Sequence, residues 1–192
     1  MPARSPATAA AAAAAPLSIE ISGRTGLGHA AYLKRHLARA HAILRPALCE
    51  LSLALVGDKR MAELHEVFMD IPGSTDVLTF ELDHDARGRV TAGEVVVCVP
   101  YALREARRRK VAAKDELLLY ALHGMLHLCG YDDRTDRDFA TMHRREDEIL
   151  NQLGVGAVFA PTAPPSHSRR RAAPSSRSRK STRRPRRSGG PA

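Results

Sequence analysis

Hydrophobic and polar residues alternate in several short runs of this chain, and longer runs between them place apolar residues every three or four positions. Alternation is typical of half-buried strands, and the longer period is typical of amphipathic helices. The predicted strands cover residues 17–22, 48–56, 77–82 and 94–99. The predicted helices cover residues 29–44, 100–109 and 113–128, with one more after Asp58 and a last one from Thr135 or Asp136 to Gly154. This order predicts one α/β (α+β layered) domain with a mixed sheet of about four strands packed by helices.

The helix after Asp58 has a residue suited to its start and an apolar stripe. Aspartate is a favoured N-cap, so Asp58 is expected to cap this helix. Met61, Leu64 and Phe68 recur at helical spacing, and we expect all three to face the core.

The helix predicted at 113–128 is apolar nearly all round, which indicates that it is buried in the domain. Gly130 follows it at the position where a C-terminal cap is wanted. His123 and His127 lie in this helix four positions apart, so both imidazoles project from one face, about one turn apart. Two imidazoles in that arrangement can share one tetrahedral metal ion.

The histidine pair alone is a weak signal, because nine histidines in 192 residues give about 0.4 chance occurrences of this spacing. Ordinary core histidines, paired for example with Tyr120, are the alternative. The context favours a metal, because an unpartnered imidazole is costly in so apolar a helix. Gly124 lowers helix stability by about 1 kcal/mol relative to alanine, which is easier to explain if something packs closely against it. Asp133 can return to the same ion beyond the turn, and two histidines with one carboxylate leave a position for water, as in catalytic zinc sites.

The net charge of +9 belongs to one end of the chain. Residues 161–192 hold ten Arg or Lys and no acidic residue, so the remainder has 20 basic and 21 acidic residues and is close to neutral. The folded part is therefore not expected to be a basic nucleic-acid-binding domain. The basic string itself either attracts phosphate backbones or is a solvated extension, and both interpretations stay open.

Composition divides the chain into three parts. Residues 1–16 are rich in alanine and are expected to be a disordered appendage or a misassigned start, since they lack the apolar centre of a secretion signal. Residues 17–155 are the expected catalytic domain, and residues 156–192 are the expected disordered basic tail. No apolar run approaches the roughly 18 residues that span a membrane. Three scattered cysteines (Cys49, Cys98 and Cys129) suggest reduced thiols without a disulfide partner, and a cytoplasmic location.

Four blocks of this sequence resemble one known family. The stretch from His123 to Asp133, which reads H-G-M-L-H-L-C-G-Y-D-D, resembles the H-G-x-L-H-x-x-G-Y-D-H signature of the YbeY family of bacterial endoribonucleases. Residues 75–80 (T-D-V-L-T-F) and 93–98 (G-E-V-V-V-C) resemble that family's T-D-V-L-S-F and G-D-I-V-I-C segments. Met142 and Glu146 fall where the family's last helix has Met and Glu. Because the blocks keep their order and spacing over about residues 17–155, the chain is identified as a member of this family.

The resemblance implies an α/β domain with one catalytic Zn²⁺ per chain, held at the signature positions His123, His127 and Asp133. It also implies cleavage of single-stranded RNA by a metallo-endoribonuclease. The partners that it suggests are ribosomal RNA and the small ribosomal subunit, in maturation of small-subunit ribosomal RNA and ribosome quality control in the cytoplasm.

The sequence departs from the family pattern at its third ligand. Asp133 replaces a histidine; a carboxylate is a competent zinc ligand, although it should favour somewhat harder ions. Asp132 aligns with a family aspartate that is not a ligand, so Asp132, like Gly124, is expected to support the site or brace its loop.

A second departure concerns the substrate cleft. Met69 stands where the family has an arginine that is thought to face this cleft, and Pro72 replaces an acidic residue. Arg104, Arg107 and Arg108 on the helix at 100–109 are candidate RNA-binding substitutes, although a basic helix face can simply be solvated.

Two rivals to the endoribonuclease remain. A zinc hydrolase of another substrate class, such as a peptidase, could use the same histidine spacing, but the H-E-x-x-H glutamate of zinc proteases is missing. A ribosome-associated metal-binding protein with weak or lost cleavage is favoured by Met69. For the nuclease we expect attack by the metal-bound water with little side-chain help. No further catalytic residue is assigned, and His143 is expected to be a surface residue of the last helix.

Overall fold

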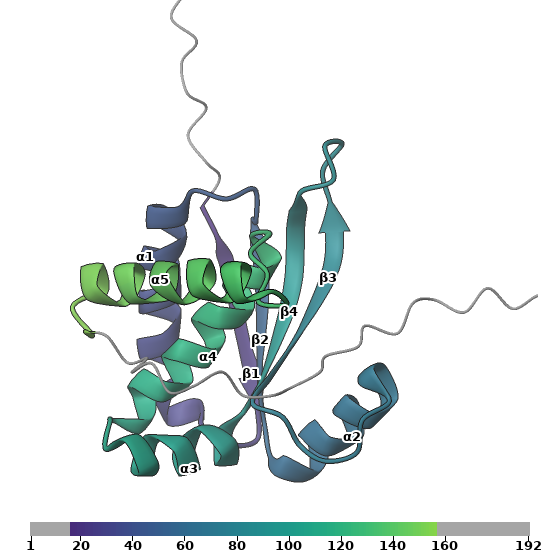
Figure 1. The fold of residues 1–192 in the computed structure, drawn as a ribbon, viewed down its shortest axis with the longest axis vertical. Helices are drawn as coiled ribbons and strands as arrows, with labels where there is room; N and C mark the ends of the chain where they lie inside the picture. The colour runs from purple at the N-terminus through teal and green to yellow at the C-terminus, as the bar shows by residue number, and fades with distance from the viewer. Residues whose placement is uncertain (1–15, 157–192) are drawn as a thin grey trace, which may run out of the picture.

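The computed structural model describes residues 16–156, and its elements follow the predicted order (Figure 1). The strands are β1 (Ser18–Gly23), β2 (Glu50–Val56), β3 (Val77–His84) and β4 (Val90–Cys98). The helices are η1 (Leu27–His29), α1 (Ala30–Leu44), α2 (Asp58–Met69), α3 (Val99–Arg109), α4 (Ala113–Leu128) and α5 (Asp136–Leu153). The expected appendage and tail lie almost entirely outside the described residues.

The four strands form one mixed sheet in the order β1-β2-β4-β3, which confirms the predicted fold class. β1, β2 and β4 are parallel, and β3 pairs antiparallel with β4 through a hairpin. Alternate residues of β4 face opposite sides, because side chains along a strand alternate between its two faces. Val95 and Val97 enter the main core, while Val96 and Cys98 enter a smaller core on the other face. In the strand order β3 comes last, so it is an edge strand, with β4 as its paired neighbour among the described strands.

Helices cover both faces of this sheet unequally. Figure 1 shows α1, α4 and α5 together on one side, where their leucines and methionines form the main core with β1, β2 and β4. α3 packs along α4 at the lower end of the view, and α2 stands apart beside the other face. Among residues 16–156, no helix is both long and apolar enough to cross a membrane.

Two expectations for α2 were wrong. Gly57 is its N-cap, and Asp58 is the first helical residue. The Asp58 carboxylate accepts two hydrogen bonds from Arg104 of α3, at 2.9 and 3.0 Å. Met61 is buried as expected, but Phe68 is 54% exposed. The reason is that α2 covers only a small apolar patch of the sheet: in its last turn Met69 packs against that patch, and Phe68 stays largely exposed.

Candidate metal centre

The two histidines interrupt an otherwise buried helix. From Glu116 to Leu128 every residue of α4 is buried except His123 and His127, whose side chains are 13% and 20% exposed. Because helical residues four apart share one face, both rings point out of the core at the same place. The structure thus presents the predicted pair at the C-terminal end of α4.

A glycine turn brings the following loop back over this end of the helix. Gly130 has φ of 90°, and its N–H donates to the carbonyl of His127 at 3.0 Å. The Tyr131 N–H donates to the carbonyl of Leu126 at 3.1 Å, which completes a Schellman cap. The chain reverses at this cap, and the Tyr131 carbonyl then faces the His127 ring.

Three ligand atoms converge beside this turn. The Nε2 atoms of His123 and His127 are 3.1 Å apart. Asp133 Oδ2 lies 3.7 Å from the first of them and 4.0 Å from the second. These three residues form a group whose ligand atoms are close enough to hold one metal ion. A tetrahedral zinc with bonds of about 2.0–2.1 Å separates its ligand atoms by about 3.3–3.5 Å, so the spacing is suitable.

The outer nitrogen of each ring is already engaged. His127 Nδ1 donates to the Tyr131 carbonyl at 3.1 Å, and His123 Nδ1 donates to Glu146 Oε1 at 2.6 Å. When both rings are neutral with Nδ1 as the donor, each Nε2 carries a lone pair that faces the other ring. Two lone pairs at 3.1 Å repel unless a proton or a metal ion lies between them. Histidine ligands of metals usually have such an outer hydrogen bond, so the donor set fits a metal centre.

Glu146 and His143 are parts of this centre that the sequence reasoning did not assign. Glu146 of α5 is fully buried, and its other oxygen accepts from His143 Nδ1 at 2.5 Å. Although burial would raise the pKa of Glu146, the charges and hydrogen bonds of His123 and His143 lower it to about 2. Burial lowers the pKa of His123, but Glu146 outweighs that effect and raises it. The carboxylate is therefore ionised and orients two imidazoles.

The expectation for His143 was wrong, because its side chain is only 13% exposed and its ring stacks on that of His123 at 5.9 Å. His123, His143 and Glu146 form a second group with metal-ligand spacing. In this group the Nδ1 atoms of both histidines hydrogen-bond the buried carboxylate. The family's Met and Glu positions on the last helix were the one signal in the sequence that could have identified Glu146.

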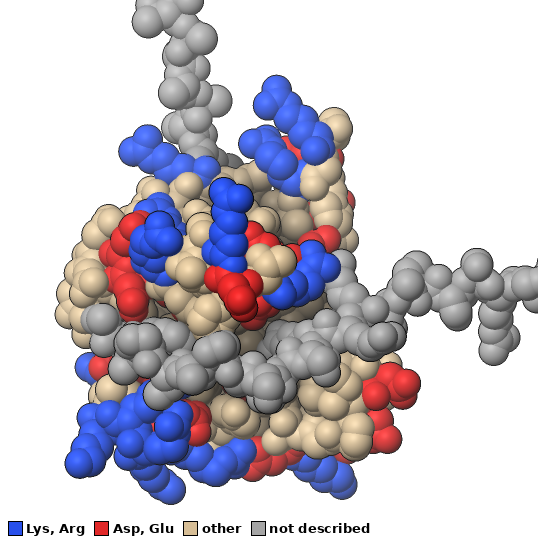
Figure 2. All heavy atoms as spheres, in the orientation of Figure 1, with Lys and Arg blue, Asp and Glu red and all other residues tan. Residues whose placement is uncertain are grey.

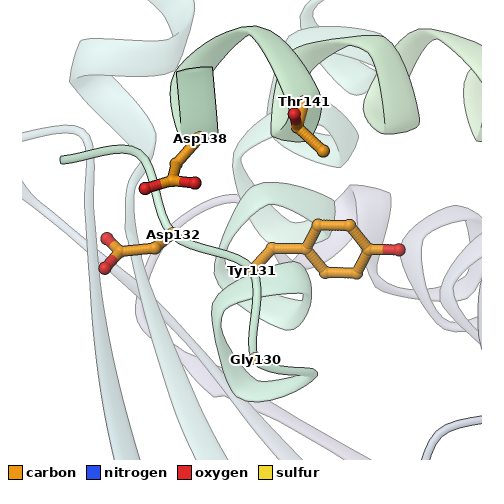
Figure 3. A pocket seen from close by; sticks show the side chains of 5 residues that line it. All are labelled: Gly130, Tyr131, Asp132, Asp138 and Thr141. Atoms are coloured by element: carbon orange, nitrogen blue, oxygen red, sulfur yellow. The ribbon is translucent and has the colours of Figure 1, made fainter. Parts of the chain in front are cut away.

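Asp132 makes local contacts in the loop that carries Asp133. Its carboxylate accepts from the Asp133 N–H at 2.9 Å and pairs with Arg134. Asp132 and Asp138 line a hollow of about 230 Å³. In Figure 3 their carboxylates lie on the same side of the view, and the Tyr131 ring extends away from both. The position of Asp132 is thus compatible with the predicted bracing role.

Gly124 allows α4 to approach the sheet closely. A Cβ atom there would lie 2.6 Å from Val95 Cγ1 and 3.2 Å from Thr79 Oγ1. The close packing that Gly124 suggested is therefore contact with β3 and β4. It places the turn that carries His123 directly against the strands.

A groove of about 600 Å³ leads to the centre. Its walls are Phe68 and Met69 at the end of α2, residues 77–81 of β3, and the turn with His127, residues 130–132 and Arg134. Met69 thus lines the groove at the position where the sequence lacks the family arginine.

The three candidate RNA-binding arginines lie elsewhere. They belong to α3, which packs along α4 and leads into the N-terminal end of that helix. Figure 2 shows a cluster of basic side chains at the lower left, over the region where Figure 1 places α3. Arg104 pairs with Asp58, and Arg108 pairs with Glu105. The structure does not bring these residues together with the histidines.

Comparison with known proteins agrees with the resemblance. The family described as "Endoribonuclease YbeY" matches residues 29–154. Proteins of that description include one from Micrococcus luteus, 38% identical over 68% of this chain and 85% of the relative, and one from Thermobifida fusca, 36% identical over 70% and 92%. The solution structure of TM1509 from Thermotoga maritima has a TM-score of 0.50 and 28% identity, and the match covers 71% of this chain and 92% of that one. These matches favour an endoribonuclease over a peptidase.

Proposed function

The chain belongs to the endoribonuclease YbeY family, and from this premise we propose a zinc-dependent endoribonuclease specific for single-stranded RNA. Its proposed role is maturation of small-subunit ribosomal RNA and ribosome quality control in the cytoplasm. The observation that carries the chemistry is the convergence of two Nε2 atoms and one carboxylate beside a groove that His127 lines.

The proposed ligands are His123, His127 and Asp133, with one ion per chain. When bound there, zinc supplies Lewis-acid chemistry that acidifies water and offsets charge on a phosphate. Glu146 and the Tyr131 carbonyl hold the two imidazoles in the tautomer that leaves Nε2 available. Asp133 contributes a negative charge in place of a third imidazole.

The groove leads substrate to these ligands, since His127 forms part of its wall. A phosphodiester in this groove would lie beside the His127 side chain. Asp132 and the glycine turn keep the loop in place during this approach. The α3 arginines are proposed to meet RNA only where a long strand extends beyond the groove.

Met69 favours one rival, a ribosome-associated metal-binding protein with weak or lost cleavage. A guanidinium in this position could hold a phosphate, and a thioether cannot. The Met69→Arg variant separates the two functions, because it restores the charge without touching the metal ligands.

The test combines metal analysis with cleavage of a single-stranded RNA by the full chain. Wild type is expected to bind zinc and to cleave, and His127→Ala is expected to lose both. His29→Ala is a matched control, because this ring lies outside both candidate groups. If wild type binds zinc without cleaving RNA, and the Met69→Arg variant does cleave it, the metal-binding protein with lost cleavage would be established. Wild type without metal would refute the proposal.

A further inference from the structure

We propose that the RNA strand lies along the outer edge of β3 and stacks one of its bases on Phe68. This inference rests on the proposed function and deepens it, because it names the contact that positions the substrate. The chain has four phenylalanines, and Phe68 is more than half exposed beside the groove.

The groove gives the strand a continuous path. It begins at the last turn of α2, follows residues 77–81 of β3, and reaches His127. These β3 residues form the outer edge of the sheet, since the paired neighbour of β3 is β4 on its other side. A volume of about 600 Å³ lies within the range of about 300–1,000 Å³ that holds drug-sized ligands, which is enough for a base and its sugar.

The Phe68 ring packs edge-on against a second aromatic ring. Its centroid lies 4.9 Å from that of Phe80, and the planes are inclined at 66°. Phe80 extends from β3 into the small core beneath α2, so it anchors Phe68 at the mouth of the groove. A ring held in this way meets a base at little entropic cost, and every base has a π-face.

The charges of the groove favour bases over phosphates at its walls. The charged side chains that line it are Glu81, Asp132 and Arg134, and the guanidinium of Arg134 pairs with Asp132. Met69 next to Phe68 adds apolar surface where a cation is absent. The strand therefore turns bases toward Phe68 and Met69, and its phosphates reach the metal ligands at the other end.

This arrangement also explains a preference for single strands. In a duplex each base is paired and stacked within its own helix, so its face is not presented to a protein ring. An unpaired base can leave its neighbours and stack on Phe68. Stacking on Phe68 would therefore make the protein bind single-stranded RNA more tightly than a duplex, at a position remote from the proposed metal ligands.

Phe68→Ala is the first test, with cleavage of a short single-stranded oligoribonucleotide by the zinc-loaded full chain. We expect KM to rise roughly tenfold, within the range found for bases stacked on aromatic rings, while kcat and zinc content stay unchanged. Phe68→Tyr should restore KM. Val67→Ala is the control, because Val67 is 75% exposed on the same helix but does not line the groove.

The second test replaces single nucleotides of the substrate by abasic ones. At one position the loss of the base should raise the KM of wild type as much as Phe68→Ala does, and it should have no further effect on that variant. Equal KM values for wild type and Phe68→Ala, with no abasic position whose effect depends on Phe68, would overturn this inference. The β3 edge would then bind another partner, such as an extended peptide. Failure of wild type to cleave any RNA would instead refute the proposed function.

Discussion

Glu146 hydrogen-bonds one of the proposed ligands, although it is not itself a proposed ligand. It is fully buried between two imidazoles, with its oxygens 2.6 Å from His123 Nδ1 and 2.5 Å from His143 Nδ1. Buried carboxylates are stable only with such partners. Each partner in turn has its ring and tautomer fixed by the carboxylate.

Replacing this carboxylate should weaken metal binding. Glu146→Gln keeps the size of the side chain but removes the charge that makes His123 a better ligand, so we expect about 10- to 100-fold lower zinc affinity. Chelator competition measures this change. Glu148→Gln is the matched control, since Glu148 is an exposed residue of the same helix that pairs with Arg145. Equal affinities of the two variants would contradict the assigned role.

The same residue predicts how the metal-free protein responds to pH. Because the pKa of Glu146 falls from 4.5 to about 2 on folding, its contribution to stability is full above pH 4.5 and is lost as the pH falls toward 2. The pKa of His123 is raised above 6.5, so its contribution is present below pH 6.5 and is lost as the pH rises through the raised value. Denaturant unfolding across pH should show both losses in metal-free wild type, and a flatter profile in Glu146→Gln. Identical profiles would contradict the ion pair.

At the scale of elements, the position of the centre follows from how closely α4 packs on the sheet. Residue 124 lies against Val95, whose branched side chain has little freedom to move. A larger residue at this point would push the helix away from β4 and displace both histidines with it.

Gly124→Ala should therefore destabilise the protein. Helix propensity alone would favour alanine by about 1 kcal/mol, but a Cβ only 2.6 Å from Val95 Cγ1 overpacks the core at a cost of about 1–3 kcal/mol. Denaturant unfolding of the metal-free protein measures the difference. Gly28→Ala is the control, because nothing lies within 4 Å of its Cβ position. Greater stability of Gly124→Ala would show that the packing is looser than the structure indicates.

The sequence predicted the elements best where burial is continuous. The bounds of α4 agree fully with the prediction, because its long run of apolar residues is typical of a buried helix. Phe68 shows the limit of periodicity, since the spacing defines a helical stripe but does not say how much of the stripe is covered. His143 was misplaced for a related reason: its contact with His123 joins two helices, and no local pattern encodes that distance.

At the scale of the whole molecule, the candidate centre and the basic face lie at opposite ends of α4. This helix has 16 residues and is about 24 Å long at 1.5 Å per residue. Arg107 and Arg108 belong to the last turn of α3, which precedes the start of α4. The charge count of the sequence predicts a nearly neutral body, but it could not say on which face of that body the cations gather.

This separation predicts that the α3 arginines affect long RNA substrates and not short ones. Combined Arg107→Ala and Arg108→Ala substitutions should leave cleavage of a short oligonucleotide unchanged, because it does not reach this face. For a long RNA, KM should rise and its dependence on salt should weaken, since fewer counterions are released. Comparing kcat/KM for both RNAs at two salt concentrations checks this. An equal loss for the short substrate would place these arginines in the cleavage site.

The most direct test of the account is the metal content of the purified chain, measured by elemental mass spectrometry. The His127→Ala and Asp133→Ala variants are measured in parallel. The predicted result is one zinc ion per wild-type chain, with metal lost from His127→Ala and reduced in Asp133→Ala. Wild-type protein that takes up no metal, or a His127→Ala variant that binds as much as wild type, would contradict the assignment of this centre.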